Sequence, residues 1–157
     1  MKGQTAIEYL MTYGWAILII LIVAGVLAYY GIFAPSGFLG PTARGFGQVQ
    51  VLNPWSVVGT TGSISLNVEN RVGGTINVTA INVTLAGDNN VYQYVLTGGK
   101  TITSGTKSVL TSGAPATPSW DSKNKDPSSA YTATITIYYD YGGSQFSSTG
   151  TISGTYS

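Results

Sequence analysis

A charge-free apolar run lies near the start of the chain and reads Trp15-Ala16-Ile17-Leu18-Ile19-Ile20-Leu21-Ile22-Val23-Ala24-Gly25-Val26-Leu27-Ala28-Tyr29-Tyr30. No charged side chain occurs between Glu8 and Arg44, so the run with its flanks exceeds the roughly 20 apolar residues that cross a bilayer as a helix. We predict a helix over residues 4–34 that ends before Pro35, because a residue preceding proline disfavours the α conformation. Its side chains are apolar on every face, and it therefore needs an apolar surround, either lipid or identical helices.

Small residues recur along one side of this predicted helix. Ala24, Ala28 and Gly31 lie three or four positions apart and permit close contact with another helix. A plain single-pass membrane anchor is the alternative interpretation, because small residues are also common in such helices.

The apolar pattern changes from helical to alternating beyond residue 48. Residues 35–48 are rich in Gly and Pro and predict a linker, whereas residues 49–157 predict a head domain. Alternating apolar and polar residues over 63–69 and 132–139 indicate half-buried strands, and Gly142-Gly143 indicates a hairpin turn before a final strand. The sequence thus predicts the α+β class, with one long apolar N-terminal helix followed by an antiparallel β-sandwich (Ig-like) head.

One predicted strand carries a break in its alternation. Ile76 and Val78 have even numbers, whereas Ile81 and Val83 have odd numbers. One extra residue near Ala80 or Ile81 keeps both sets on the same face, as a β-bulge does. Further along, the Pro- and Ser-rich residues 111–129 predict one long exposed loop.

The composition excludes several functional classes. Charged residues make up 8% of the chain, against roughly 25% in typical domains. The net charge of +1 offers no basic surface, so we expect no nucleic-acid partner. The chain has no cysteine and no histidine, which excludes disulfides, thiolate or imidazole metal sites, and catalysis by either residue. We expect no enzyme, metal or cofactor; a glycosidase built on Glu69 and Asp140 is a remote alternative.

The eight residues Met1-Lys2-Gly3-Gln4-Thr5-Ala6-Ile7-Glu8 precede the apolar run. A secretory signal peptide normally places its small-residue cleavage site after the apolar stretch, whereas here Gly3 and Gln4 come before it. Glu8 is a lone acid at the start of the run, one helical turn from Gln4.

This motif resembles the class III signal sequence of archaeal type IV pilins, in the group with glutamine after the cut and glutamate four residues later. The resemblance implies that residues 1–3 are a leader peptide and that a membrane-embedded prepilin peptidase cleaves the Gly3–Gln4 bond. Family members then leave the membrane through the pilus assembly machinery and stack their helices in a filament core, with β-sandwich heads outside. The resemblance covers about the first 30 residues, and Ala6 stands where the group often has a small hydroxyl residue.

Two roles are open for Glu8. Cleavage after Gly3 leaves an ammonium group on Gln4, and the Glu8 carboxylate of the same or a neighbouring subunit neutralises it, which favours one axial register because an unpaired buried charge is costly. Alternatively, Glu8 is an acid near a helix start that interacts favourably with the helix dipole.

Four other features are candidate sites. Asn77-Val78-Thr79 and Asn82-Val83-Thr84 fit the N-glycosylation pattern, and the bulge would place Asn77 and Asn82 on the outward face. Residues 121–126 superficially resemble a Ca²⁺ loop, but a solvated turn is favoured because a lysine replaces an oxygen ligand. Trp55, Trp120 and the tyrosines either form a sugar platform or, as is usual for aromatic residues in small β domains, make core or inter-subunit contacts.

The resemblance, together with the apolar helix and the predicted β-sandwich, implies a pilin, a structural subunit of an archaeal type IV-like pilus that serves surface attachment. The expected partners are copies of the same chain, the prepilin peptidase with the assembly machinery, and the membrane before assembly. The expected location is an extracellular filament, with the plasma membrane holding the precursor. The alternative is a single-pass membrane-anchored extracellular binding module that does not polymerise.

Overall fold

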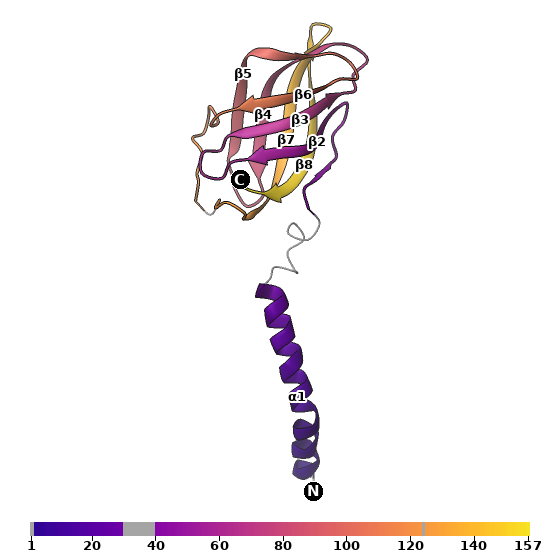
Figure 1. Ribbon diagram of the computed structural model, residues 1–157, viewed down its shortest axis with the longest axis vertical. Coiled ribbons are helices and arrows are strands. Elements are labelled where there is room, and N and C mark those ends of the chain that lie inside the picture. The colour runs from indigo at the N-terminus through magenta and orange to yellow at the C-terminus, as the bar shows by residue number, and fades with distance from the viewer. Residues whose placement is uncertain (1, 30–39, 124) are drawn as a thin grey trace. The chain divides into compact units, whose positions relative to one another are not determined.

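The computed structural model describes residues 2–29, 40–123 and 125–157. The chain divides into two units, Met1–Phe38 and Leu39–Ser157, and each is described by itself. The first unit contains the helix α1 (Lys2–Tyr29), drawn in indigo in Figure 1. The predicted helix is therefore confirmed over residues 4–29, while residues 30–34, Gly31 among them, lie outside the described part of the chain.

The second unit is the head. Within its described residues, the regular elements are all β-strands. Their bounds are β1 (Thr42–Arg44), β2 (Val49–Val57), β3 (Ile64–Asn70), β4 (Ile76–Leu85), β5 (Val91–Ile102), β6 (Lys107–Ser112), β7 (Ala130–Tyr141) and β8 (Ser144–Thr155). The strands form a five-stranded sheet in the order β1-β8-β7-β4-β5 and a three-stranded sheet in the order β2-β3-β6, with antiparallel pairing throughout. The predicted α+β arrangement of an apolar helix followed by an antiparallel sandwich is confirmed.

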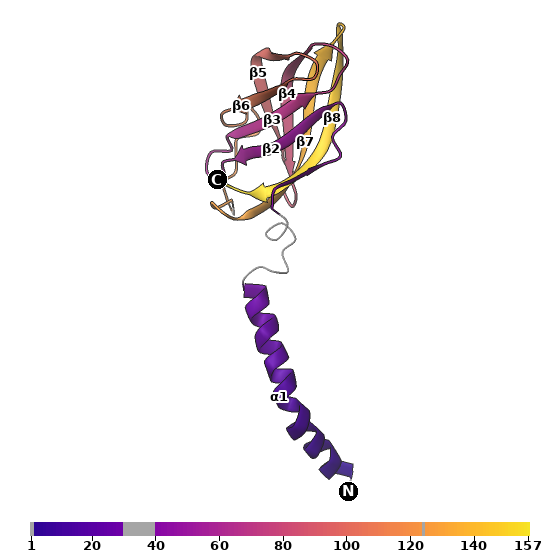
Figure 2. The same ribbon diagram turned by 45° about the vertical axis from the view of Figure 1, so that its right-hand side comes forward.

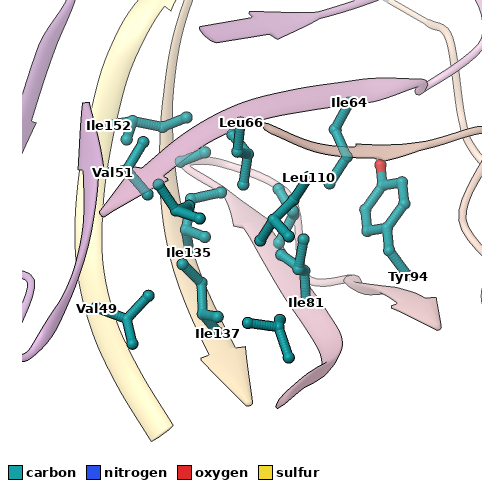
Figure 3. Packing of buried hydrophobic residues seen from close by; sticks show 14 of the residues in the cluster. Val49, Val51, Ile64, Leu66, Ile81, Tyr94, Leu110, Ile135, Ile137 and Ile152 are labelled. Carbon is teal, nitrogen blue, oxygen red and sulfur yellow. The ribbon is translucent and has the colours of Figure 1, made fainter. Parts of the chain in front are cut away.

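The two sheets form two layers. In both views the strands of the smaller sheet cross those of the larger sheet at a steep angle (Figures 1 and 2). In regular strands the inward side chains come from alternate positions, as the alternating pattern predicts: β3, for example, buries Ile64, Leu66 and Val68. They meet residues such as Ile81, Ile135 and Ile137 of the larger sheet, so that branched aliphatic side chains fill the space between the layers (Figure 3).

The hairpin and the bulge predicted from the sequence are both present. Tyr141 pairs with Ser144 at the end of β7 and β8, and Gly142 and Gly143 between them have φ values of 60° and 83°, which favour glycine. In β4 the register shifts between Val78 and Ala80 against both neighbouring strands. Residues on the two sides of the shift stay buried, as the change of parity requires.

Two segments expected to be irregular are partly ordered by the sandwich. Within the expected linker 35–48, residues 42–44 form β1 and pair with β8, and Phe46 packs against the core. Residues 111–129 were expected to be one exposed loop, and that prediction is wrong in part. Thr111 and Ser112 belong to β6, and Pro115, Trp120 and Lys125 are buried or half-buried.

A buried asparagine joins the turns at one end of the sandwich. Asn70, which has no exposed surface, donates from Nδ2 to the carbonyls of Gly74 and Ile102, each at 2.9 Å. Its Oδ1 accepts the backbone N–H of Val72 at 2.8 Å. One carboxamide therefore satisfies three backbone groups from the turn after β3 and from the end of β5.

Candidate functional site: the apolar helix and the head surfaces

The surface of α1 is apolar and open along its length. The most apolar 18-residue stretch within residues 3–29 has a mean hydropathy of 2.4, and none of that stretch is buried. Large side chains such as Leu10, Ile20 and Leu21 are each about 65% exposed, where the core of a soluble domain would cover them. The helix is long and apolar enough to cross a membrane, as a signal sequence or a membrane anchor is.

The residues of the processing motif lie in the first turns of α1. Gly3, Gln4 and Glu8 are all exposed. A side chain at Gly3 would meet no atom within 4 Å, so the folded chain itself does not need a glycine there. Gln4 and Glu8 are four positions apart and share one face of the helix. Glu8 also accepts a hydrogen bond at its backbone carbonyl from Oγ1 of Thr12 at 2.9 Å.

Two of the three predicted packing residues lie in the described part of α1. Ala24 and Ala28 are one turn apart on one face and both are exposed. The adjacent Gly25 also has space beside it, because an added Cβ would meet no atom within 4 Å. This face is free to accept another helix at close range.

The two sequon asparagines lie on β4, which is flanked by β5 and β7 in the larger sheet. The predicted outward orientation of Asn77 and Asn82 is confirmed, since their neighbours Val78, Ile81 and Val83 point into the core. Both asparagines are only half-exposed, and in the described part of the chain the Oδ1 atom of each is buried without a hydrogen-bond partner. Their glycosylation stays a prediction.

The two head tryptophans pack against the hydrophobic core, in agreement with the core contacts predicted from the sequence. Trp55 donates from Nε1 to the Tyr131 hydroxyl at 3.1 Å, and Trp120 donates to the Gly59 carbonyl at 2.7 Å. Burial raises the pKa of Tyr131 to about 12, so this hydroxyl stays protonated at any ordinary pH.

The candidate carboxylates of a glycosidase lie on different surfaces. Glu69 points outward from the smaller sheet, where Arg71 binds its Oε2 at 2.8 Å. Asp140 points outward from β7 in the larger sheet. The head core separates the two, so they do not form an acid–base pair across one substrate.

A lysine that the sequence analysis placed in a solvated turn is buried, so that interpretation is wrong for this residue. Only 7% of Lys125 is exposed. Its Nζ atom lies 4.6 Å from the ring centre of Trp120 and 5.3 Å from that of Tyr92. It also contacts Oδ2 of Asp88 and the hydroxyl of Tyr92, both at 3.4 Å, and the carbonyl of Asp121. The sequence separates these residues too widely for its local pattern to reveal the cluster.

The carboxylate of Asp88 is held in its charged form by this cluster. The Tyr92 hydroxyl donates to its Oδ2 at 2.6 Å, and this hydrogen bond, together with that from the Asn90 backbone and the Lys125 charge, lowers the pKa of Asp88 below 3.8. A lowered carboxyl pKa contributes stability above its ordinary value and loses it as the pH falls through the folded-state value.

We therefore expect the wild-type chain to have a larger free energy of unfolding than Asp88→Asn, by a difference (the stability gap) that depends on pH. The gap should be full at neutral pH and should narrow as the pH falls below 3.8, because the Asp88 carboxylate is then being protonated. Thermal unfolding of both proteins across this range measures it. A gap of constant size at every pH would show that the charge of Asp88 contributes nothing.

An open groove of about 440 Å³ lies where the edge strands β5 and β6 of the two sheets face each other. Val95 and Val109 on its walls are 54% and 53% exposed, and Leu110 lies at its buried side. Within the described residues no group of His, Cys, Asp and Glu side chains is arranged to hold a metal ion.

Comparisons with known proteins give no family for this chain. No protein-family model matches it, and no curated protein matches it. A search of solved structures aligns it with the solution structure of a late embryogenesis abundant (LEA) protein at 14% identity, covering 93% of this chain and 89% of that one, with a TM-score of 0.29. At that TM-score the alignment carries no argument about fold or function.

Proposed function

We propose that the chain is a pilin, the subunit of an archaeal type IV-like surface filament used for attachment. In this proposal α1 packs with α1 helices of other copies to form the filament core, and the heads form its outer surface. The observation that carries the proposal is a helix with a long, exposed apolar stretch, in which the small-residue motif Gly3-Gln4 comes before the apolar stretch and not after it.

The exposed surface of α1 supplies the driving force for assembly. Removing apolar surface from water contributes about 25 cal/mol per Å². Lipid satisfies the same surface before assembly, so the choice between lipid and other helices depends on close packing. The open face around Ala24 and Ala28 favours such packing, since small side chains let two helix backbones approach.

The glycine before Gln4 supports processing by another protein. Nothing in the described residues crowds Gly3, so packing within the chain does not require a glycine here, and a peptidase that binds the backbone at this position would. The composition of the head is also compatible with a dense assembly. Its surface is polar with few charges, so neighbouring copies repel one another weakly.

The first residue of the chain isolated from cells tests the proposal. A subunit that begins at Gln4 is the expected result for a processed pilin. A chain that begins at Met1 or Lys2 in the mature protein contradicts processing and favours the membrane-anchored binding module. For that alternative, the groove between β5 and β6 is the candidate site on the head.

A further inference from the structure

The segment between β6 and β7 closes one side and one end of the head. We call residues 113–123 and 125–129 the strap. Near its start, the Thr117 carbonyl accepts the backbone N–H of Gln93 at 2.8 Å, and the Ala116 N–H donates to the Gln93 carbonyl at 2.7 Å. Gln93 lies on β5, the last strand of the five-stranded sheet. The strap therefore pairs with a free sheet edge at Gln93, where backbone groups would otherwise be open to another strand.

The middle of the strap covers the end of the core. The Trp120 ring packs at a tilt against the Tyr92 ring, with 4.6 Å between ring centres, and lies directly against Gly62, where no side chain fits. The Tyr94 hydroxyl beneath donates to the Gly62 carbonyl at 2.7 Å. Without the strap, Tyr92, which has no exposed surface, would lose part of its cover.

Lys125 supplies a charged attachment between the strap and the head. Its ammonium group lies in a box formed by the Tyr92 and Trp120 rings, with Asp88 as the opposite charge. The Asp121 carbonyl, within the strap itself, completes its contacts. The ion pair is largely buried, with side-chain exposures of 8% for Lys125 and 19% for Asp88, so removing one partner costs far more than at a surface pair.

We propose that Lys125 clamps the strap over the β5 edge, and that this clamp prevents strand-to-strand pairing between heads of neighbouring copies. The proposed occupant of the uncovered edge is a second copy of this chain. β5 carries exposed Val91 and Val95 on either side of Gln93, which makes the edge attractive to another strand. Charge gives little protection elsewhere on the head, since charged residues make up only 8% of the chain.

The test compares Lys125→Met with Lys123→Met in the full chain held in detergent. Methionine keeps the apolar stem of the lysine but lacks its charge. Lys123 is exposed and belongs to the same strap, so it controls for loss of a positive charge. Hydrogen exchange of the Gln93 and Ala116 amides reports on the strap, and exchange of the amides of β7 reports on the whole fold.

We expect Lys125→Met to speed exchange at Gln93 and Ala116 by about tenfold or more, which corresponds to about 1.4 kcal/mol of opening free energy. Exchange in β7 should change much less, and Lys123→Met should match the wild type. The opened variant should also form head-to-head associations that grow with protein concentration. Unchanged exchange at Gln93 and Ala116 would overturn the clamp, and opening without any association would overturn the protection of the edge.

A second variant covers the case in which Lys125→Met unfolds the whole head. Asp88→Asn removes the charge partner and leaves the buried ammonium between the two rings without its counter-charge, so faster exchange at the same strap amides is expected here too. A uniform rise in exchange over β7 and the strap in both variants would also overturn the proposal, because the cluster would then support the fold as a whole.

Discussion

The Glu8→Ala variant is expected to enter the membrane normally and to form few or no filaments. In the proposed processed chain, cleavage after Gly3 leaves an ammonium group on Gln4, which shares a helix face with Glu8. Inside an apolar bundle, removing the Glu8 carboxylate leaves that ammonium without a partner, and loss of one member of a buried pair costs roughly 3–5 kcal/mol. Insertion does not need the carboxylate, because the residues beyond it supply the apolar length.

The measurement is electron microscopy of surface filaments together with the amount of chain in the membrane fraction. Glu8→Gln keeps the size of the side chain without its charge and should fail in the same way. Glu69→Ala, which breaks an exposed ion pair with Arg71, should assemble as the wild type does, since surface pairs contribute about 0–1 kcal/mol. Filaments of normal number and length from Glu8→Ala would contradict the role in axial register.

The Asn70→Ala variant is expected to lose about 3 kcal/mol or more of head stability, because three backbone groups lose their partner and an unpaired buried polar group costs about 1–3 kcal/mol. The midpoint of thermal unfolding should fall by about 10 °C or more. Near-ultraviolet circular dichroism of the full chain in detergent follows the loss of tertiary packing.

Asn67→Ala is the matched control on the same strand. Asn67 points outward from β3 and is half-exposed, so its replacement should change stability by about 0.5 kcal/mol or less. Equal effects of the two substitutions would show that the buried carboxamide of Asn70 has no special role in joining the turns.

The sequence was sufficient to predict the features that depend on short-range pattern. Uninterrupted apolar residues predicted α1, and alternation predicted β3, β7 and β8. The change of parity between Val78 and Ile81 predicted the bulge, because side-chain alternation leaves few other ways to bury both sets. Each of these predictions uses residues that are neighbours in the chain.

Features that depend on long-range contacts were missed. Lys125 lies 33 residues from Tyr92 and 37 from Asp88, and a lysine in a polar stretch is normally solvated. Asn70 is the last residue of β3, and its carboxamide reaches the carbonyl of Ile102, 32 residues away. These groups meet only in the folded chain, and no periodic pattern in the sequence predicts which of them will be in contact.

The roles proposed for the processing and assembly residues rest mainly on the sequence. The structure places Gly3, Gln4 and Glu8 on an exposed helix, and it places Ala24 and Ala28 on an open face. In the cell this helix is covered by other molecules, either lipid or further copies of the chain. Contacts within one chain therefore do not identify what covers it.

The claim that α1 packs against other copies of α1 is tested most directly by a three-dimensional image of filaments taken from the cell surface, with this chain traced in the density. We expect side-by-side α1 helices along the filament axis, in mutual contact around Ala24 and Ala28, with every chain starting at Gln4. Surface filaments that lack this chain, while the chain itself stays singly embedded in lipid with Met1–Gly3 retained, would contradict the proposal.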